Sequence, residues 1–167
     1  NEPFAVLLAD DLMTGPQGGK GVMAQMTDAF MKQGRSLLAV QEVPREQTKR
    51  YGIVAGEPAG GSLIRIEQIV EKPAPENAPS TMGVAGRYVL TPGIFEQIRN
   101  QPKGVGGEIQ LTDAIERLMA NEAVYAFQYK GKRYDCGSKD GFLHATVELA
   151  LQHPDVGVAF RDYLKQL

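Results

Sequence analysis

The chain has 167 residues, of which 43% are hydrophobic and 23% charged, as in an ordinary single globular domain. The net charge is −2 and the basic residues are scattered, which excludes an electrostatic surface for nucleic acid or an anionic membrane. No run approaches the roughly 20 apolar residues of a membrane span. One cysteine, Cys136, excludes an internal disulfide and favours a reducing cytoplasm.

Hydrophobic periodicity, with glycine and proline as breaks, predicts alternating strands and helices along the whole chain. In chain order the expected elements are a strand at 4–8, a helix at 21–33, strands at 36–43, 51–55, 63–70 and 82–90, helices at 92–101 and 112–121, a strand at 124–129, and helices at 139–153 and 154–167. This alternation predicts an α/β fold with a mixed, mostly parallel sheet flanked by helices. No linker divides the chain, so residues 1–167 are expected to form a single domain.

The tripeptide Glu71-Lys72-Pro73 directly follows the strand expected at 63–70. A sugar phosphate needs a compact cation for its phosphate and an acceptor for its hydroxyl protons, and adjacent residues at the end of a strand can supply both. Taken alone, a solvated Glu–Lys pair entering a loop is the simpler interpretation. The neighbouring motifs therefore decide between the two.

Two aspartates are candidates for a metal site. Asp10 ends the apolar run at 4–8, where ligands of open α/β sheets bind, and Asp135 precedes a glycine at 137. Carboxylate oxygens are suited to Mg²⁺, which is completed by phosphate oxygens and water. Each aspartate could instead be a turn or helix-cap residue. Thr112 is expected to cap the helix at 112–121.

Several motifs taken in order resemble one enzyme family. They are residues 7–10 (LLAD), 51–54 (YGIV), 71–73 (EKP), 86–90 (GRYVL), 107–113 (GEIQLTD) and 135–137 (DCG). The set is similar to the bacterial glucose-1-phosphate uridylyltransferases of the sugar nucleotidyltransferase family, over nearly the whole chain. The resemblance implies the Rossmann-like fold of nucleotide-diphospho-sugar transferases. It also implies that the chain is the C-terminal part of such a protein, without the N-terminal nucleotide-binding part and its Gly-rich loop.

The resemblance also implies roles for individual residues. Glu71 accepts hydrogen bonds from sugar hydroxyls, and Lys72 contacts the phosphate attached to the sugar. The main chain of Gly52 and the segment that contains Gly83 and Val84 face the sugar. Asp10 and Asp135 hold Mg²⁺, so that Lys72 and Asp10 are the expected catalytic residues.

The activity that the resemblance implies is the formation of UDP-glucose and pyrophosphate from UTP and α-D-glucose 1-phosphate, by a homo-oligomeric cytoplasmic protein, with the chain alone catalytically incomplete. Three alternatives stay open: a thymidylyl- or adenylyl-transferring relative, a sugar-phosphate-binding module without turnover, and a structural or assembly segment. The last would use an apolar helix near the end of the chain, bearing Val158, Phe160, Tyr163, Leu164 and Leu167. Burial of those side chains within the same chain is an equally good interpretation.

Overall fold

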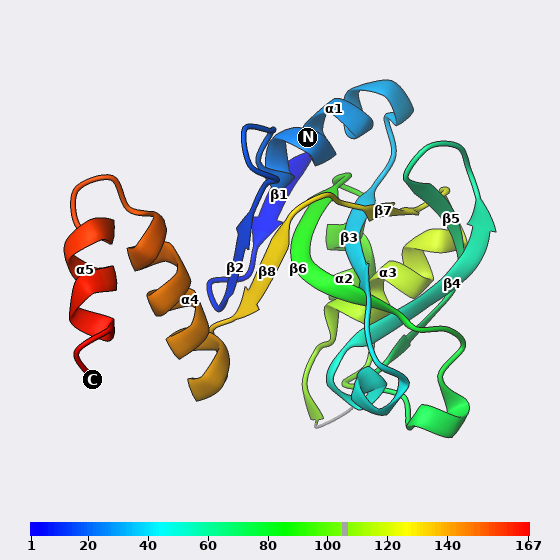
Figure 1. Ribbon diagram of the computed structural model, residues 1–167. Helices are drawn as coiled ribbons and strands as arrows, with labels where there is room; N and C mark the ends of the chain where they lie inside the picture. The colour runs from blue at the N-terminus through cyan, green and yellow to red at the C-terminus, as the bar shows by residue number, and fades with distance from the viewer. Residues whose placement is uncertain (105–106) are drawn as a thin grey trace.

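A computed structural model describes residues 1–104 and 107–167, and its centre is a curled six-stranded sheet (Figure 1). The strands, in spatial order, are β1 (Phe4–Leu7), β6 (Met82–Leu90), β3 (Leu37–Glu42), β7 (Tyr125–Gln128), β5 (Leu63–Glu71) and β4 (Gly52–Pro58). Strand β4 also pairs with β6, so five of these strands close into a small barrel and β1 extends from its edge. Short 3₁₀ turns at Arg45–Arg50 and Pro75–Asn77 precede β4 and β6.

The sheet is mostly antiparallel, so the prediction of a mostly parallel, Rossmann-like sheet is wrong. Among the described residues the only parallel pairing in this sheet is β3 with β7, and the other five pairings are antiparallel. The predicted order already placed four strands in succession, observed as β3, β4, β5 and β6, and these have no α-helical crossover between them, so a parallel sheet did not follow from it. Antiparallel neighbours need no helical crossover, so chain order alone does not reveal their direction.

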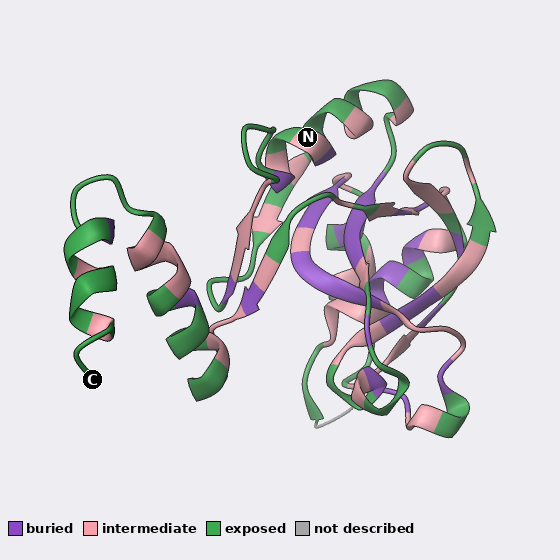
Figure 2. Cartoon of the chain, in the orientation of Figure 1, coloured by how far each residue is buried: buried purple, intermediate pink, exposed green. Residues whose placement is uncertain are grey.

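The fully buried run of β3 shows why these strands resemble those of a parallel sheet. Leu38 and Val40 face a core formed by the sheet with α2 (Ile94–Asn100) and α3 (Leu111–Met119). Leu37 and Ala39 face a second core under α1 (Val22–Gln33). Both faces of β3 are therefore covered, and its sequence loses the alternation that marks a half-exposed antiparallel strand (Figure 2).

Two short strands that the sequence analysis did not predict form a separate two-stranded sheet. Strand β2 (Asp11–Thr14) pairs antiparallel with β8 (Lys132–Asp135), and Asp11 lies opposite Asp135. Each strand has four residues, and three of the four in β8 are charged, so neither strand carries the apolar signal on which strand prediction depends. This pairing joins the segment after β1 to the segment after β7.

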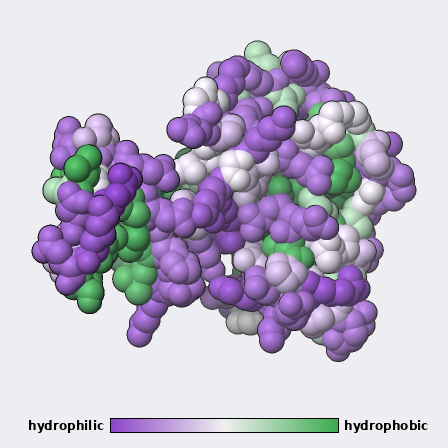
Figure 3. All heavy atoms as spheres, viewed as in Figure 1, coloured by the Kyte–Doolittle hydropathy of each residue, from purple (hydrophilic) through white to green (hydrophobic). Residues whose placement is uncertain are grey.

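The last two helices, α4 (Lys139–Gln152) and α5 (Gly157–Leu164), pack against each other beside the β2–β8 sheet, at one side of the molecule. Phe160 and Leu164 are half-buried, whereas Val158, Tyr163 and Leu167 are exposed. Phe142 and Leu143 of α4 are also exposed, and hydrophobic residues are visible on this pair of helices in Figure 3. In the described part of the chain, no helix combines the length and the apolar character that crossing a membrane requires.

Gly34 allows a stability prediction, because it ends α1 in the left-handed conformation, with φ 61°. No atom lies within 4 Å of the position that a Cβ would take at Gly34 or at Gly21, which precedes the same helix with φ −59°. Gly34→Ala is therefore expected to lower the free energy of unfolding by about 1 kcal/mol through backbone strain alone. Urea unfolding would measure this loss, and Gly21→Ala should stay within about 0.5 kcal/mol of the wild type. Equal losses in the two variants would contradict the strain argument.

Candidate functional site

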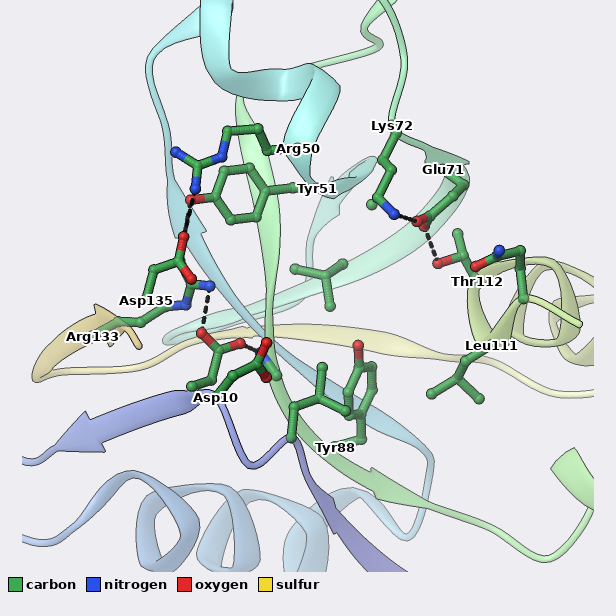
Figure 4. Close-up of a pocket in the computed structure, with 16 residues that line it drawn as sticks. Asp10, Arg50, Tyr51, Glu71, Lys72, Tyr88, Leu111, Thr112, Arg133 and Asp135 are labelled. Atoms are coloured by element: carbon green, nitrogen blue, oxygen red, sulfur yellow. Dashed lines mark hydrogen bonds and ion pairs between the residues drawn. The ribbon is translucent and has the colours of Figure 1, made fainter. Parts of the chain in front are cut away.

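A cleft of about 360 Å³ lies where the barrel, the start of α3 and the β2–β8 sheet meet (Figure 4). Its walls are formed by Leu8, Asp10, Asp11, Arg50, Tyr51, Gly52, Glu71, Lys72, Val84, Gly86, Tyr88, Gln110, Leu111, Thr112, Arg133 and Asp135. All the site residues expected from the sequence line it except Gly83. The volume is within the range of small-molecule sites, and the lining has cations and carboxylates on facing walls.

Glu71 is the last residue of β5, and its side chain is only 12% exposed in the wall of the cleft. The Thr112 hydroxyl donates a hydrogen bond of 2.6 Å to Glu71 Oε2, and the Lys72 ammonium lies 3.4 Å from Oε1. The prediction that Thr112 caps its helix is wrong, because α3 begins at Leu111 and the capping position is Gln110. The side chain of Thr112 instead orients the Glu71 carboxylate.

Lys72 has φ 46°, the only positive φ of a residue other than glycine in the described ranges. Its backbone N–H donates to the carbonyl oxygen of Tyr51 at 3.0 Å, which ties the turn after β5 to the start of β4. A left-handed lysine costs of order 1 kcal/mol and persists only where its surroundings impose it. This turn places the side chains of two consecutive residues, Glu71 and Lys72, on the same cleft, with that of Lys72 52% exposed.

The predicted glycines have different environments. Gly52 pairs with Glu71 across β4 and β5, and a Cβ there would lie 3.2 Å from the Thr112 hydroxyl and 3.3 Å from Glu71 Oε2. The glycine thus leaves open the space beside the oriented carboxylate. Gly83 is buried behind the cleft, and a Cβ on it would contact Val43 and the Tyr51 ring. Val84, the next residue, lines the cleft.

Asp10 and Asp135, predicted from the sequence as metal ligands, both have a carboxylate oxygen near Gly137, and their role in a metal site stays a prediction. Asp10 Oδ2 and Asp135 Oδ1 lie 2.9 Å and 3.3 Å from the point that a Cβ on Gly137 would occupy. The backbone N–H of Cys136 also donates to the Asp10 carbonyl oxygen at 2.7 Å, which fixes the two segments together. The other carboxylate oxygen of Asp135, Oδ2, accepts a hydrogen bond from Arg50 Nη2 at 2.5 Å.

These two carboxylates fit a Mg²⁺ ion, because Mg²⁺ in phosphate-transfer sites takes one or two carboxylates and fills its other positions with water and phosphate oxygens. Within residues 1–104 and 107–167, no group of three or more acidic, histidine or cysteine side chains forms a closed cation site. A Mg²⁺ ion at Asp10 and Asp135 would take its other ligands from water and phosphate oxygens.

The ion pair at the base of the cleft was not expected from the sequence. Asp11 is buried, and its carboxylate accepts from the Gly86 N–H at 2.8 Å and pairs with Arg133. Arg133 Nη1 also donates to the Tyr51 hydroxyl at 3.1 Å, and its guanidinium lies 5.2 Å from the centre of the Tyr51 ring. Burial acts to lower the pKa of Arg133, but the charge and hydrogen bond of Asp11 outweigh it and the pKa is raised. The pair is part of the framework that holds β2, β6 and β8 together.

The phenol of Tyr88 also lines the cleft. Tyr88 lies on β6, which pairs with β1 on one side and with β3 on the other. Burial raises its pKa to about 12, the carboxylates of Glu71 and Asp11 act in the same direction, and Arg133 opposes them. The hydroxyl is therefore protonated at neutral pH. The sequence analysis named the motif around Tyr88 but gave the residue itself no role.

Comparisons with known proteins agree on one family. The family model described as nucleotidyl transferase matches residues 1–152. The chain is 44% identical over its whole length to a UTP–glucose-1-phosphate uridylyltransferase of Staphylococcus epidermidis, and 47% identical over 87% of its length to one of Pseudomonas aeruginosa. It spans 57% and 52% of the lengths of these two relatives.

Solved structures give the same result for the fold. A UDP-glucose pyrophosphorylase complexed with UDP-glucose aligns with 92% of the chain at a TM-score of 0.88 and 42% identity, and the chain covers 58% of it. A UTP-bound enzyme of the same kind from Acinetobacter baumannii aligns with 98% at a TM-score of 0.85 and 38% identity, and the chain covers 56% of it.

These comparisons confirm the resemblance to the uridylyltransferases but not the expected position of the chain within them. The prediction that the chain is a C-terminal part is wrong, because the nucleotidyl transferase match starts at residue 1 and continues to residue 152. The match accounts for most of the chain as nucleotidyl transferase sequence.

Proposed function

The chain belongs to the nucleotidyl transferase family. We propose that it functions as part of a UTP–glucose-1-phosphate uridylyltransferase, the enzyme that makes UDP-glucose and pyrophosphate from UTP and α-D-glucose 1-phosphate. One observation carries the proposal: a cleft that places an oriented carboxylate and a lysine on one wall and two convergent carboxylates on another. The names of the relatives, and the UDP-glucose and UTP bound in two of the similar structures, support the choice of substrates.

The proposed roles of the residues follow from the geometry of the cleft. Glu71, held by Thr112, accepts hydrogen bonds from two sugar hydroxyls, and Gly52 leaves room for the sugar beside it. Lys72 donates to the phosphate that is attached to the sugar. The backbone of Val84 contacts the opposite side of the sugar.

Asp10 and Asp135 would hold a Mg²⁺ ion, which when bound would neutralise phosphate charge. Arg50 competes for Asp135, because their side chains are paired at 2.5 Å. In the proposed reaction the nucleophile is a phosphate oxygen of glucose 1-phosphate, so the chain needs to position and neutralise rather than to form a covalent intermediate. Lys72 supplies fixed positive charge on the sugar side of the bond that forms.

Pyrophosphate release from UTP and α-D-glucose 1-phosphate is the test of this function, with the reverse reaction from UDP-glucose as a check. The proposal expects release that requires both substrates and Mg²⁺. Absence of turnover, together with absence of UDP-glucose binding to the folded chain, would contradict it. Binding without turnover would favour the alternative of a sugar-nucleotide-binding module.

Replacement of Asp10 tests the metal assignment. Asp10→Asn removes one of two anionic ligands, so the Mg²⁺ concentration for half-maximal pyrophosphate release should rise at least about tenfold. Isothermal titration with Mn²⁺ should show the same loss of affinity without turnover. The matched control is Asp155→Asn, which changes an exposed aspartate between α4 and α5. An unchanged metal titration in Asp10→Asn would show that Asp10 is a turn residue and not a metal ligand.

Nucleotide choice is the finer part of the proposal. A thymidylyl-transferring relative shares the scaffold, since a structure described as a putative glucose-1-phosphate thymidylyltransferase of Bacillus anthracis aligns at a TM-score of 0.67 with 20% identity. Uridine is favoured because the relatives at 44% to 47% identity carry the uridylyl name. Competition of UTP, dTTP and ATP in the same assay would decide this, and a preference for dTTP or ATP would overturn the choice of uridine.

A homo-oligomer in the cytoplasm is also part of the proposal. The last two helices expose several large apolar side chains that a second copy of the chain could cover, namely Phe142, Leu143, Val158, Tyr163 and Leu167. Light scattering over a range of protein concentrations should show association. A strict monomer at all concentrations would remove the oligomer from the proposal.

A further inference from the structure

The hydroxyl of Tyr88 projects into the cleft, and its role is not covered by the roles given above. Val84, Gly86 and Tyr88 alternate along β6 and face the same side of the strand, where all three line the cleft. The Tyr88 ring belongs to the main core and the residue is 9% exposed. Figure 4 shows its hydroxyl pointing away from the strand, on the side of the pocket where Leu111 and Thr112 begin α3.

Within residues 1–104 and 107–167 the Tyr88 hydroxyl has no hydrogen-bond partner, and it is absent from the fully buried side-chain atoms without a partner, so it is open to the cleft. The hydroxyl of Tyr51 accepts from Arg133, that of Thr112 donates to Glu71, and the Gly86 N–H donates to Asp11. A hydroxyl that lines a cleft and has no protein partner takes its hydrogen-bond partner from whatever fills the cleft. In an open cleft that partner is water or a ligand.

The charges around Tyr88 select the kind of ligand group that it can bind. The carboxylates of Glu71 and Asp11 raise the pKa of the phenol, and the opposing effect of Arg133 is smaller than that of either carboxylate, so these charges together disfavour an anionic phosphate at this position. The side chains of Lys72 and Arg50, which attract phosphate, belong to other walls of the cleft. A neutral sugar hydroxyl beside Tyr88 meets no such repulsion, and its oxygen can accept a hydrogen bond from the phenol.

We propose that Tyr88 is a specificity residue, which donates a hydrogen bond to one hydroxyl of the sugar while Glu71 accepts from others. The assignment rests on the proposed function, since it takes the cleft to be the sugar site. It adds an uncharged donor to a cleft whose carboxylates act only as acceptors. A sugar that lacks the hydroxyl in question would leave the phenol unpaired again, which is how the contact discriminates.

Tyr88→Phe tests this assignment because it removes one oxygen and keeps the ring in the core. The dissociation constant for UDP-glucose, measured by isothermal titration in the presence of Mg²⁺, should rise about fivefold to tenfold. The midpoint of urea unfolding of the ligand-free protein should not fall, since the hydroxyl has no partner in the protein. The matched control is Tyr134→Phe, where the hydroxyl donates to Glu148 at 2.8 Å in a different cavity. That variant should keep its affinity for UDP-glucose.

A second arm uses UDP-glucose analogues that each lack one sugar hydroxyl. One analogue should lose affinity for the wild type and lose nothing further with Tyr88→Phe. Equal affinity of Tyr88→Phe and wild type for UDP-glucose, with equal responses to every analogue, would overturn the Tyr88 assignment and leave the proposed function standing. Failure of the folded wild type to bind UDP-glucose or α-D-glucose 1-phosphate at all would overturn both.

Discussion

Replacing Lys72 by glutamine is expected to lower kcat/KM for α-D-glucose 1-phosphate roughly 150-fold, which corresponds to a loss of about 3 kcal/mol of transition-state stabilisation. The ammonium is the cation beside Glu71 at the end of β5, and the turn that carries it is held by a backbone bond to Tyr51. A charge-assisted contact to phosphate is stronger than a neutral one, and an amide keeps the length of the chain but not the charge. The measurement is the initial rate of pyrophosphate release at subsaturating glucose 1-phosphate.

The left-handed backbone at Lys72 separates the loss of function from a loss of folding. Lys72→Gly also removes the charge, but it relieves the strain of φ 46° and should stabilise the protein by up to about 1 kcal/mol. Lys32→Gln, which changes an exposed lysine on α1, should leave the rate unchanged. Near-normal turnover in both Lys72 variants would remove Lys72 from the site.

Removing the carboxylate of Asp11 is expected to cost about 3 to 5 kcal/mol of folding free energy. Asp11→Ala leaves the guanidinium of Arg133 and the Gly86 N–H without their partner in a buried position. Single domains of this size are stable by only about 5 to 15 kcal/mol, so urea unfolding should show a large shift of the midpoint.

The neighbouring aspartate provides the control for that experiment. Asp10→Ala changes the same kind of side chain one position earlier, but Asp10 is exposed, so its loss should stay within about 0.5 kcal/mol. The double variant Asp11→Ala with Arg133→Met should recover part of the stability, because it removes the unpaired charge. Similar losses for Asp10→Ala and Asp11→Ala would contradict the assignment of Asp11 to the framework and Asp10 to the ligand.

The positions of the main elements and part of the cleft could be predicted from sequence. Strand β6 was expected at 82–90 and is observed as Met82–Leu90 because its apolar run is long and bounded by clear breaks. Glu71 and Lys72 were identified because a charged pair directly after a strand, followed by proline, belongs at a strand end, where ligands bind. Both residues do lie in the cleft.

Strand direction and the buried ion pair could not be predicted. The barrel closes through β4 and β6, a contact between strands that are not consecutive, and local periodicity carries no information about it. Arg133 stands in a short charged strand that looks like a solvated turn, and only its pairing with β2 brings it to Asp11. The prediction of a parallel sheet failed for a related reason, since a barrel strand covered on both faces has the same composition as a parallel one.

Amide chemical-shift mapping would show whether the cleft beside Glu71 and Lys72 is the sugar-nucleotide site. UDP-glucose with Mg²⁺ would be titrated into the ¹⁵N-labelled 167-residue chain, which at 18.2 kDa suits such spectra. The account predicts saturable shifts at Gly52, Lys72 and Thr112, with smaller shifts on α1. Saturable shifts confined to α4 and α5, or no shift in the cleft of the folded protein at millimolar ligand, would contradict it.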